Sequence, residues 1–296
     1  MRTILKPCIL GTLLSLMLWW SCATQHSFRH TLPADVTFNK DAGRGCLIIV
    51  TLQLDGGEKL PFVLDTASPW TLFDTSLEPK LGKRLSTTTM WNFGVKQESG
   101  VYAAPKLYLG STRLMMTRTN IPTIDLKQAS SRGANPFLGV LGMDCLEHYC
   151  IQLDFASCKM RFLDAEHANK KGWGKPFSLT DIGDGCFCVS ETLVGLKGVG
   201  SLIDTGCDHY GWLTPQLFEY WTDHAMLPEG GQVRSPNGVL GGNTYSNVDL
   251  HGLDAKVLLS GDSHTRLNGI GLRFLARHLV TLDFPNRTIY LKRTSF

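Results

Sequence analysis

Two short stretches decide the fold, Val63-Leu64-Asp65-Thr66-Ala67-Ser68 and Leu202-Ile203-Asp204-Thr205-Gly206-Cys207, whose aspartates are 139 positions apart. In each, apolar residues typical of a buried strand run directly into an aspartate, a threonine and a small residue. The pattern predicts a carboxyl group that emerges from a strand on a tight turn, with little side-chain bulk beside it. Taken alone, either stretch also fits an ordinary turn capped by aspartate.

The sequence downstream of each turn is repeated. Residues 142–162 (GMDCLEHYCIQLDFASCKMRF) align without a gap on residues 271–291 (GLRFLARHLVTLDFPNRTIYL), at an offset of 129. Both copies predict a glycine, a short helix, a strand ending in Leu-Asp-Phe, a turn and a second strand. Asp154 and Asp283 repeat in register, but because each precedes a hairpin turn we expect a structural role for them.

The sequence upstream of each turn is repeated as well. A predicted strand at 46–54 and a turn at 55–57 precede Asp65, and a strand at 186–196 with a turn at 197–198 precedes Asp204. One β-rich unit is therefore written twice. A duplicated unit forms a pseudo-dimer, in which one residue from each copy meets at the pseudo-twofold axis.

The N-terminus predicts an export signal. Arg2 and Lys6 precede an apolar run, Cys8–Trp20, which is followed by small residues ending at Ala23. The run is shorter than the roughly 20 residues of a membrane-spanning helix. We therefore predict a signal peptide at 1–23 and a periplasmic or secreted protein. The alternative is a lipoprotein signal in which Cys22 is acylated and anchors the protein to a membrane.

Composition describes a globular protein with a sizeable core, because 43% of the 296 residues are hydrophobic and 19% are charged. The formal net charge is +3; without Arg2 and Lys6, 27 basic against 26 acidic residues leave +1. This balance does not predict a nucleic-acid partner.

Cysteine spacing does not predict a metal site. Seven of the nine cysteines follow the signal peptide, an odd number that leaves at least one outside any intrachain disulfide. Cys186 and Cys188 alternate on a strand and point to opposite faces, which is poor geometry for one tetrahedral ion. We expect buried or disulfide-bonded cysteines, no metal and no cofactor. A cysteine-based redox or metal protein is a third reading of the chain.

Two aspartates on one axis suit peptide hydrolysis. Carboxyl groups about 3 Å apart cannot both ionise, so one acts as base and the other as acid. The base activates a water molecule, and the acid protonates the scissile carbonyl.

The chain resembles the retropepsin-like and pepsin-like aspartic peptidases in their single-chain, two-lobed form. The two Asp-Thr turns carry the resemblance, together with an apolar-apolar-Gly strand behind each, Val140-Leu141-Gly142 and Gly269-Ile270-Gly271. It spans residues 46 to 292. It implies an all-β fold, mostly β with a few short helices, in which two pseudo-symmetric acid-protease-type β-barrel lobes enclose the active site. We expect lobes at 42–165 and 176–296, a linker at 166–175, and a linker or short pro-segment at 24–41.

The resemblance also implies roles for the residues of the turns. Asp65 and Asp204 would be catalytic, Thr66 and Thr205 would lock the turns together, and Ser68 would hydrogen-bond the Asp65 carboxylate. A substrate-covering flap would be the hairpin around Met90 to Gln97, with a counterpart near Val239 to Thr244. The residues expected at or next to the first flap tip are Trp91, Asn92, Phe93 and Gly94.

Two positions depart from the family pattern. Ala67 stands where the family usually has Gly, and Cys207, after Gly206, stands where Ser, Thr or Ala is common. The leading hypothesis is an aspartic endopeptidase that acts as a monomer on peptide or protein substrates. The alternative is a proteolytically inactive protein of the same fold that binds peptides.

Overall fold

The structure is a computed structural model that describes residues 35–92, 95–131, 135–183, 185–190, 200–223, 232–235, 238–240, 243–245, 248–252 and 267–294. The predicted signal peptide at 1–23 and residues 24–34 of the predicted linker lie outside the described residues. In the part of the chain that is described, no helix is both long enough and apolar enough to cross a membrane.

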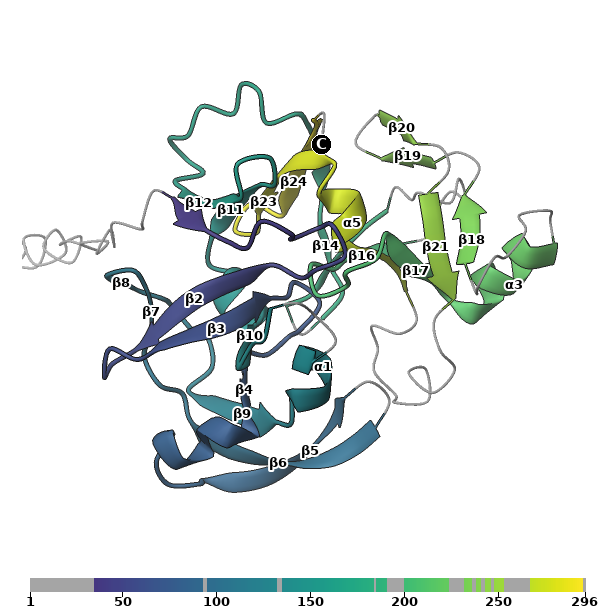
Figure 1. Ribbon diagram of the computed structural model, residues 1–296. Helices are drawn as coiled ribbons and strands as arrows, with labels where there is room; N and C mark the ends of the chain where they lie inside the picture. Colours follow the sequence, from purple (N-terminus) through teal and green to yellow (C-terminus); the bar gives the residue numbers. More distant parts are fainter. Residues whose placement is uncertain are drawn as a thin grey trace, which may run out of the picture. The chain divides into compact units, whose positions relative to one another are not determined.

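The fold is mostly β, as predicted, with a few short helices (Figure 1). Four of the helices have four to six residues, and α3 has nine. The helices are η1 (Thr75–Lys80, a 3-10 helix), α1 (Lys127–Ser131), α2 (Met143–Leu146), α3 (Pro215–Asp223) and α5 (Leu272–Leu275).

Nine strands, all from the first half of the chain, form the largest sheet, whose long β5–β6 hairpin lies at the bottom of Figure 1. Their order is β5-β6-β9-β4-β10-β3-β2-β7-β8. The strands are β5 (Ser86–Asn92), β6 (Val95–Ala103), β9 (Asn120–Ile124), β4 (Leu72–Asp74), β10 (Gly139–Leu141), β3 (Lys59–Leu64), β2 (Ile49–Leu54), β7 (Leu107–Leu109) and β8 (Thr112–Arg113).

A seven-stranded sheet from the second half has the order β14-β15-β16-β22-β17-β21-β18, and two further strands form a separate hairpin, β19-β20. The strands are β14 (Thr180–Asp181), β15 (Phe187–Val189), β16 (Ser201–Ile203), β22 (Asn268–Ile270), β17 (Gly211–Leu213), β21 (Val248–Gly252), β18 (Gln232–Ser235), β19 (Gly238–Leu240) and β20 (Asn243–Tyr245).

These two sheets share an internal plan. In the first, β10 pairs in parallel with β3 and antiparallel with β4, and β4 pairs in parallel with β9. In the second, β22 pairs in parallel with β16 and antiparallel with β17, and β17 pairs in parallel with β21. The order β6-β9-β4-β10-β3-β2 therefore corresponds to β18-β21-β17-β22-β16-β15. The repeat found in the sequence is therefore matched by a repeat of strand order and strand pairing in the structure.

A third, six-stranded sheet joins the two halves, in the order β1-β12-β11-β23-β24-β13. At its centre Gln152 of β11 is paired with Thr281 of β23, and the amide of Gln152 donates to Thr281 Oγ1 at 2.9 Å. These residues are 129 positions apart, which is the offset of the repeat, so the pseudo-twofold axis passes between them. The strands are β1 (Val36–Thr37), β12 (Lys159–Leu163), β11 (Cys150–Asp154), β23 (His278–Asp283), β24 (Thr288–Arg293) and β13 (Lys175–Ser178).

Asp154 and Asp283 have the structural role that we predicted. Asp154 accepts a hydrogen bond from the backbone N–H of Ser157, and Asp283 accepts from the backbone and side-chain nitrogens of Asn286. Each carboxylate thus caps the hairpin turn that follows its strand.

The expectation of two closed β-barrels is not confirmed. Within the described ranges each sheet has two open ends; in the largest, these are β5 and β8, which do not pair with each other. The core is shared instead of divided, because one continuous cluster of buried side chains includes Leu64 and Leu141 of the first half and Leu202 and Ile270 of the second.

Candidate functional site

Asp65 and Asp204 lie at the carboxyl ends of two equivalent strands, β3 and β16. The backbone N–H of Asp65 donates to the carbonyl of Leu141 on β10, at 3.1 Å. The backbone N–H of Asp204 donates to the carbonyl of Ile270 on β22, at 3.0 Å. Each aspartate therefore leaves the sheet at the same point, with a parallel strand fixing its backbone.

Two threonines join the turns by reciprocal hydrogen bonds. Thr66 Oγ1 donates to the carbonyl of Ile203 at 2.7 Å and accepts from the backbone N–H of Thr205 at 3.1 Å. Thr205 Oγ1 donates to the carbonyl of Leu64 at 2.7 Å and accepts from the backbone N–H of Thr66 at 3.1 Å. Both threonines are buried. The four bonds are related by the pseudo-twofold axis and hold the aspartates of the two halves together.

Backbone donors orient both carboxyl groups. Asp65 Oδ1 accepts from the N–H groups of Ala67 at 2.8 Å and Ser68 at 3.1 Å, and Asp204 Oδ1 accepts from the N–H of Gly206 at 2.6 Å. The carboxyl groups are also hydrogen-bonded to each other. Burial, followed by the charge of Asp65, raises the pKa of Asp204 well above its usual value. The pair is therefore arranged to hold one proton.

Gly206 is required by the close approach of the two turns. A Cβ atom at this position would lie 2.4 Å from Cγ of Asp65, closer than real contacts allow. Ala67 holds the equivalent place in the first turn. Its φ angle is not among the positive values of the described non-glycine residues, so its backbone conformation accepts a methyl group.

A second pair of glycines lets the strands behind the turns come close. A Cβ at Gly142 would lie 2.3 Å from the carbonyl oxygen of Trp70, and one at Gly271 would lie 2.3 Å from that of His209. These are the glycines of the two apolar-apolar-Gly strands picked out in the sequence, and they allow the backbone of each turn to rest on the strand behind it.

Ser68 and Cys207 occupy equivalent places with different side chains. Ser68 reaches the Asp65 carboxylate through its backbone N–H, whereas its hydroxyl donates to the carbonyl of Trp70 at 2.8 Å. The role implied for Ser68 therefore belongs to its backbone. The N–H of Cys207 likewise donates to Asp204, and burial raises the pKa of the Cys207 thiol, so this thiol is not a nucleophile at neutral pH.

One buried residue of the site was missed by the sequence reasoning. Asp144, on α2, accepts from the backbone N–H of Thr71 at 2.8 Å and from its hydroxyl at 2.7 Å, and Thr71 Oγ1 accepts from the N–H of Gly142 at 3.2 Å. This network ties the first turn to its supporting helix. Burial raises the pKa of Asp144. The aspartate does not recur in the second copy, where Arg273 stands at the equivalent position, so the repeat drew no attention to it.

The predicted flap is a hairpin. β5 pairs with β6 from Ser86↔Val101 to Asn92↔Val95, which places Trp91 and Asn92 at the end of β5. The tip residues Phe93 and Gly94, and the side chains of Trp91 and Asn92, lie outside the described residues. The predicted counterpart is the β19–β20 hairpin, and its Gly241 and Gly242 also lie outside. Their role in covering a substrate stays a prediction.

The cysteines are mainly core residues. Cys145, Cys150, Cys186 and Cys188 are buried, and Sγ of Cys186 contacts the carbonyl oxygen of Ala67 at 3.5 Å.

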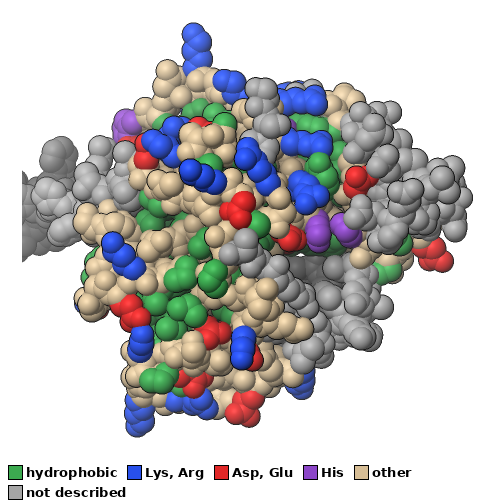
Figure 2. All heavy atoms as spheres, in the orientation of Figure 1, with side chains coloured by type: hydrophobic (Ala, Val, Ile, Leu, Met, Phe, Trp, Pro, Cys, Tyr) green, Lys and Arg blue, Asp and Glu red, His purple; other side chains and the backbone are tan. Residues whose placement is uncertain are grey.

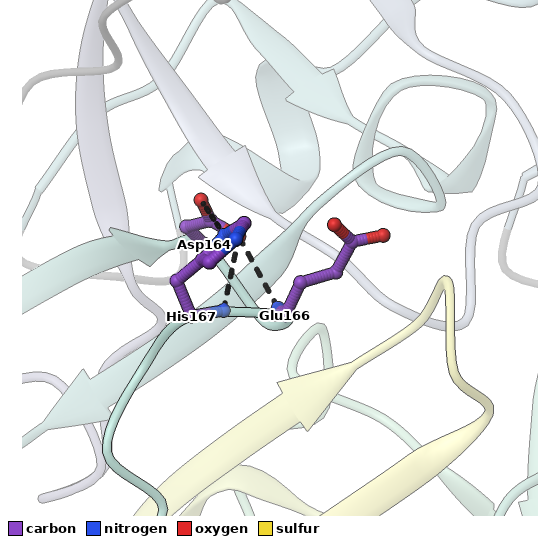
Figure 3. Close-up of side chains that lie close together, drawn as sticks. All are labelled: Asp164, Glu166 and His167. Atoms are coloured by element: carbon purple, nitrogen blue, oxygen red, sulfur yellow. Dashed lines mark hydrogen bonds and ion pairs between the residues drawn. The ribbon is translucent and has the colours of Figure 1, made fainter.

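One group in the described part of the chain has the residue types of a metal site: Asp164, Glu166 and His167, whose ligand atoms lie within 4.8 Å of one another (Figure 3). All three residues are exposed. Asp164 Oδ1 accepts from the backbone N–H groups of Glu166 and His167, and its Oδ2 lies 2.8 Å from His167 Nδ1. These contacts cap a turn, and the carboxylate of Glu166 points away from the other two side chains in Figure 3. We assign no metal to this group.

No protein-family model matches the chain, and a search of curated proteins found no significant similarity.

Proposed function

We propose that the protein is an aspartic endopeptidase, with Asp65 and Asp204 as its catalytic pair. The observation that supports this most strongly is the set of reciprocal threonine bonds. They bring together two aspartates from two copies of one unit and leave their carboxyl groups in contact. An aspartate can cap its own turn without a second turn hydrogen-bonded to it, so a capping role alone does not explain this arrangement.

The surroundings of the pair favour an acid and a base. Asp204 is 8% exposed, and its raised pKa favours the protonated form. Asp65 is half-buried and accepts two backbone N–H bonds, which stabilise a carboxylate. We therefore take Asp204 as the resting acid and Asp65 as the resting base.

The reaction then follows from this distribution of the proton. Asp65 takes a proton from a water molecule held between the carboxyl groups, and the water oxygen attacks the scissile carbonyl carbon. Asp204 donates its proton to the carbonyl oxygen, which gives a neutral tetrahedral diol. The diol collapses when the amide nitrogen receives a proton from Asp65 and one hydroxyl returns its proton to Asp204. Both carboxyl groups regain their starting forms.

We further propose that each half is a lobe of the acid-protease type in a single-chain member of the retropepsin-like and pepsin-like peptidases. The shared strand order of the two larger sheets supports this assignment. The bound peptide would be extended, with the β5–β6 hairpin adding main-chain contacts. The apolar N-terminal run supports export and, if Cys22 is acylated, a membrane anchor.

The test is cleavage of a diverse peptide library between pH 3 and 8 by the parent protein and by Asp65→Asn and Asp204→Asn. We expect cleavage by the parent that declines as rising pH deprotonates Asp204, and a loss of about 10²–10⁴-fold in each variant. Asp154→Asn is a matched control, because this aspartate repeats in register but caps a hairpin. It should leave cleavage unchanged.

Two outcomes would contradict the proposal: no cleavage by the parent at any pH, or equal cleavage by parent and variants. If the parent binds peptides from the library without cleaving them, the inactive peptide-binding protein is the better account. Circular dichroism of each variant shows whether it is folded.

A further inference from the structure

Beyond Asp204, a histidine of the second Asp-Thr turn packs against a histidine of the seven-stranded sheet. The ring centroids of His209 and His251 are 4.3 Å apart, with an angle of 36° between the planes. His209 follows Asp204 by five residues in the same turn, whereas His251 comes from β21, which lies two strands from β22 in the sheet. The proposed catalytic reaction leaves this pair unused.

The backbone around His209 is hydrogen-bonded to α5. Its carbonyl oxygen accepts from the N–H of Arg273 at 3.0 Å, and the carbonyl of Cys207 accepts from the N–H of Leu272 at 2.7 Å. The imidazole itself is not enclosed, because 51% of the His209 side chain is exposed. A backbone fixed by hydrogen bonds thus presents an accessible imidazole five residues beyond Asp204.

The charges around the pair are mixed. Asp208 lies 3.4 Å from His209 Nε2, and Asp208 and Asp249 favour a charged His251. Burial, His209 and Arg273 oppose that charge, and together they lower the pKa of His251. Two imidazolium rings whose centroids lie 4.3 Å apart repel each other, so each further anion near the pair favours its full protonation.

We propose that His209 and His251 form the element that selects an acidic side chain in the peptide substrate. This inference rests on the proposed peptidase function. The distance between Asp204 and His209 limits where the selected residue can lie on the peptide. The two are five positions apart in the chain, a stretch that spans at most about 18 Å. An extended peptide rises 3.2–3.4 Å per residue, so the acidic side chain lies within about five residues of the scissile bond.

A surface of mixed charge does not by itself select an acidic side chain. Lysine, arginine and acidic side chains are all spread over the face in view (Figure 2). At the position equivalent to His209, the first turn carries Trp70, with the guanidinium of Arg118 4.3 Å from its ring centroid. Because arginine cannot be deprotonated in proteins, a preference that changes near pH 6 would be the signature of histidine.

Selection by imidazole has a thermodynamic consequence. Binding of a carboxylate raises the proton affinity of the pair, and the complex takes up a proton. Affinity for an acidic peptide therefore increases as pH falls through the titration range of histidine, while affinity for the isosteric glutamine peptide does not change by this route.

The experiment uses the full chain and one cleaved peptide in which each of five positions on either side of the scissile bond is Glu or Gln. KM and kcat are measured at pH 5.5 and 7.5. At one position we expect KM to be about fivefold lower for the Glu peptide than for the Gln peptide at pH 5.5, with similar kcat values. This ratio of the two KM values should shrink toward one at pH 7.5. His209→Gln and His251→Gln should each abolish this ratio, and His167→Gln, an exposed histidine of the predicted linker, should keep it.

Binding of the same labelled peptides to Asp204→Asn, followed by fluorescence anisotropy, separates this inference from the proposed function. Cleavage without a pH-dependent Glu preference, or a preference that persists in both histidine variants, would overturn the assignment of the pair. Absence of cleavage together with a Glu preference in binding would contradict the peptidase and leave the assignment intact.

Discussion

The reciprocal threonine bonds should contribute a large part of the stability that joins the two halves. Thr66→Val replaces the hydroxyl with a methyl group of similar size, so it removes two hydrogen bonds without opening a cavity. It leaves the carbonyl of Ile203 and the N–H of Thr205 unpaired in a buried site. Each orphaned buried group costs about 1–3 kcal/mol, so we expect the free energy of unfolding to fall by roughly 2–6 kcal/mol. The total free energy of unfolding of a native protein is only about 5–15 kcal/mol, so this loss would be a large part of it.

Thr205→Val should cost about the same amount, because it orphans the carbonyl of Leu64 and the N–H of Thr66. The double variant should cost less than the sum. With all four bonds gone, the turns can part and admit water, which then satisfies the orphaned groups.

The assay is equilibrium unfolding of the full chain in urea, with Thr66→Ser and Thr205→Ser as controls that keep the hydroxyl. Each serine variant should remain within about 1.5 kcal/mol of the parent, since it loses only one methyl group. If either valine variant falls by less than 1 kcal/mol, or by no more than its serine control, the bonds do not stabilise the joined turns and our reasoning is refuted.

Three further predictions concern single residues. Gly206→Ala should lower kcat/KM of peptide cleavage by at least about 100-fold, because its methyl would displace Asp65, whereas Ala67→Gly should retain cleavage. Burial lowers the pKa of His278 to about 4 against an unfolded value of 6.5, so the unfolded chain binds the extra proton. The parent should lose about 3 kcal/mol of stability between pH 6.5 and 4, and urea unfolding of His278→Gln should lack this loss. Burial raises the pKa of Asp144, so the stability that this group contributes is present below pH 4 and is lost as pH rises. In thermal unfolding, the stability of Asp144→Asn relative to the parent should therefore increase between pH 4 and 7.

The sequence predicted the repeat because the two copies kept their register. The offset of 129 is reproduced at the central pair, Gln152 and Thr281, and in the matching helices α2 and α5. Strand periodicity and turn residues are local properties, so they identify such elements without knowledge of distant contacts.

Contacts between distant segments could not be predicted in the same way. Asp144 bonds to a residue 73 positions earlier, and His251 stacks on a ring 42 positions earlier. Neither contact leaves a periodic pattern, and neither residue is repeated in the other half. The donor by which Ser68 bonds Asp65 was also open in the sequence, because the resemblance specified a bond but not which donor of the serine makes it; in the structure it is the backbone N–H.

The differences between the two Asp-Thr turns matter more for the proposed acid–base chemistry than their symmetry does. If both turns were identical, the shared proton would have two equivalent sites, and neither aspartate would be committed as acid or base. The missing Cβ of Gly206 faces Asp65, so we infer from the pseudo-twofold axis that the methyl of Ala67 lies on the side of Asp204. A methyl group there removes water from one carboxyl and not the other, which agrees with the deeper burial of Asp204. Ala67, which in the sequence departs from the family pattern, is on this reasoning a source of the difference between the proposed acid and the proposed base.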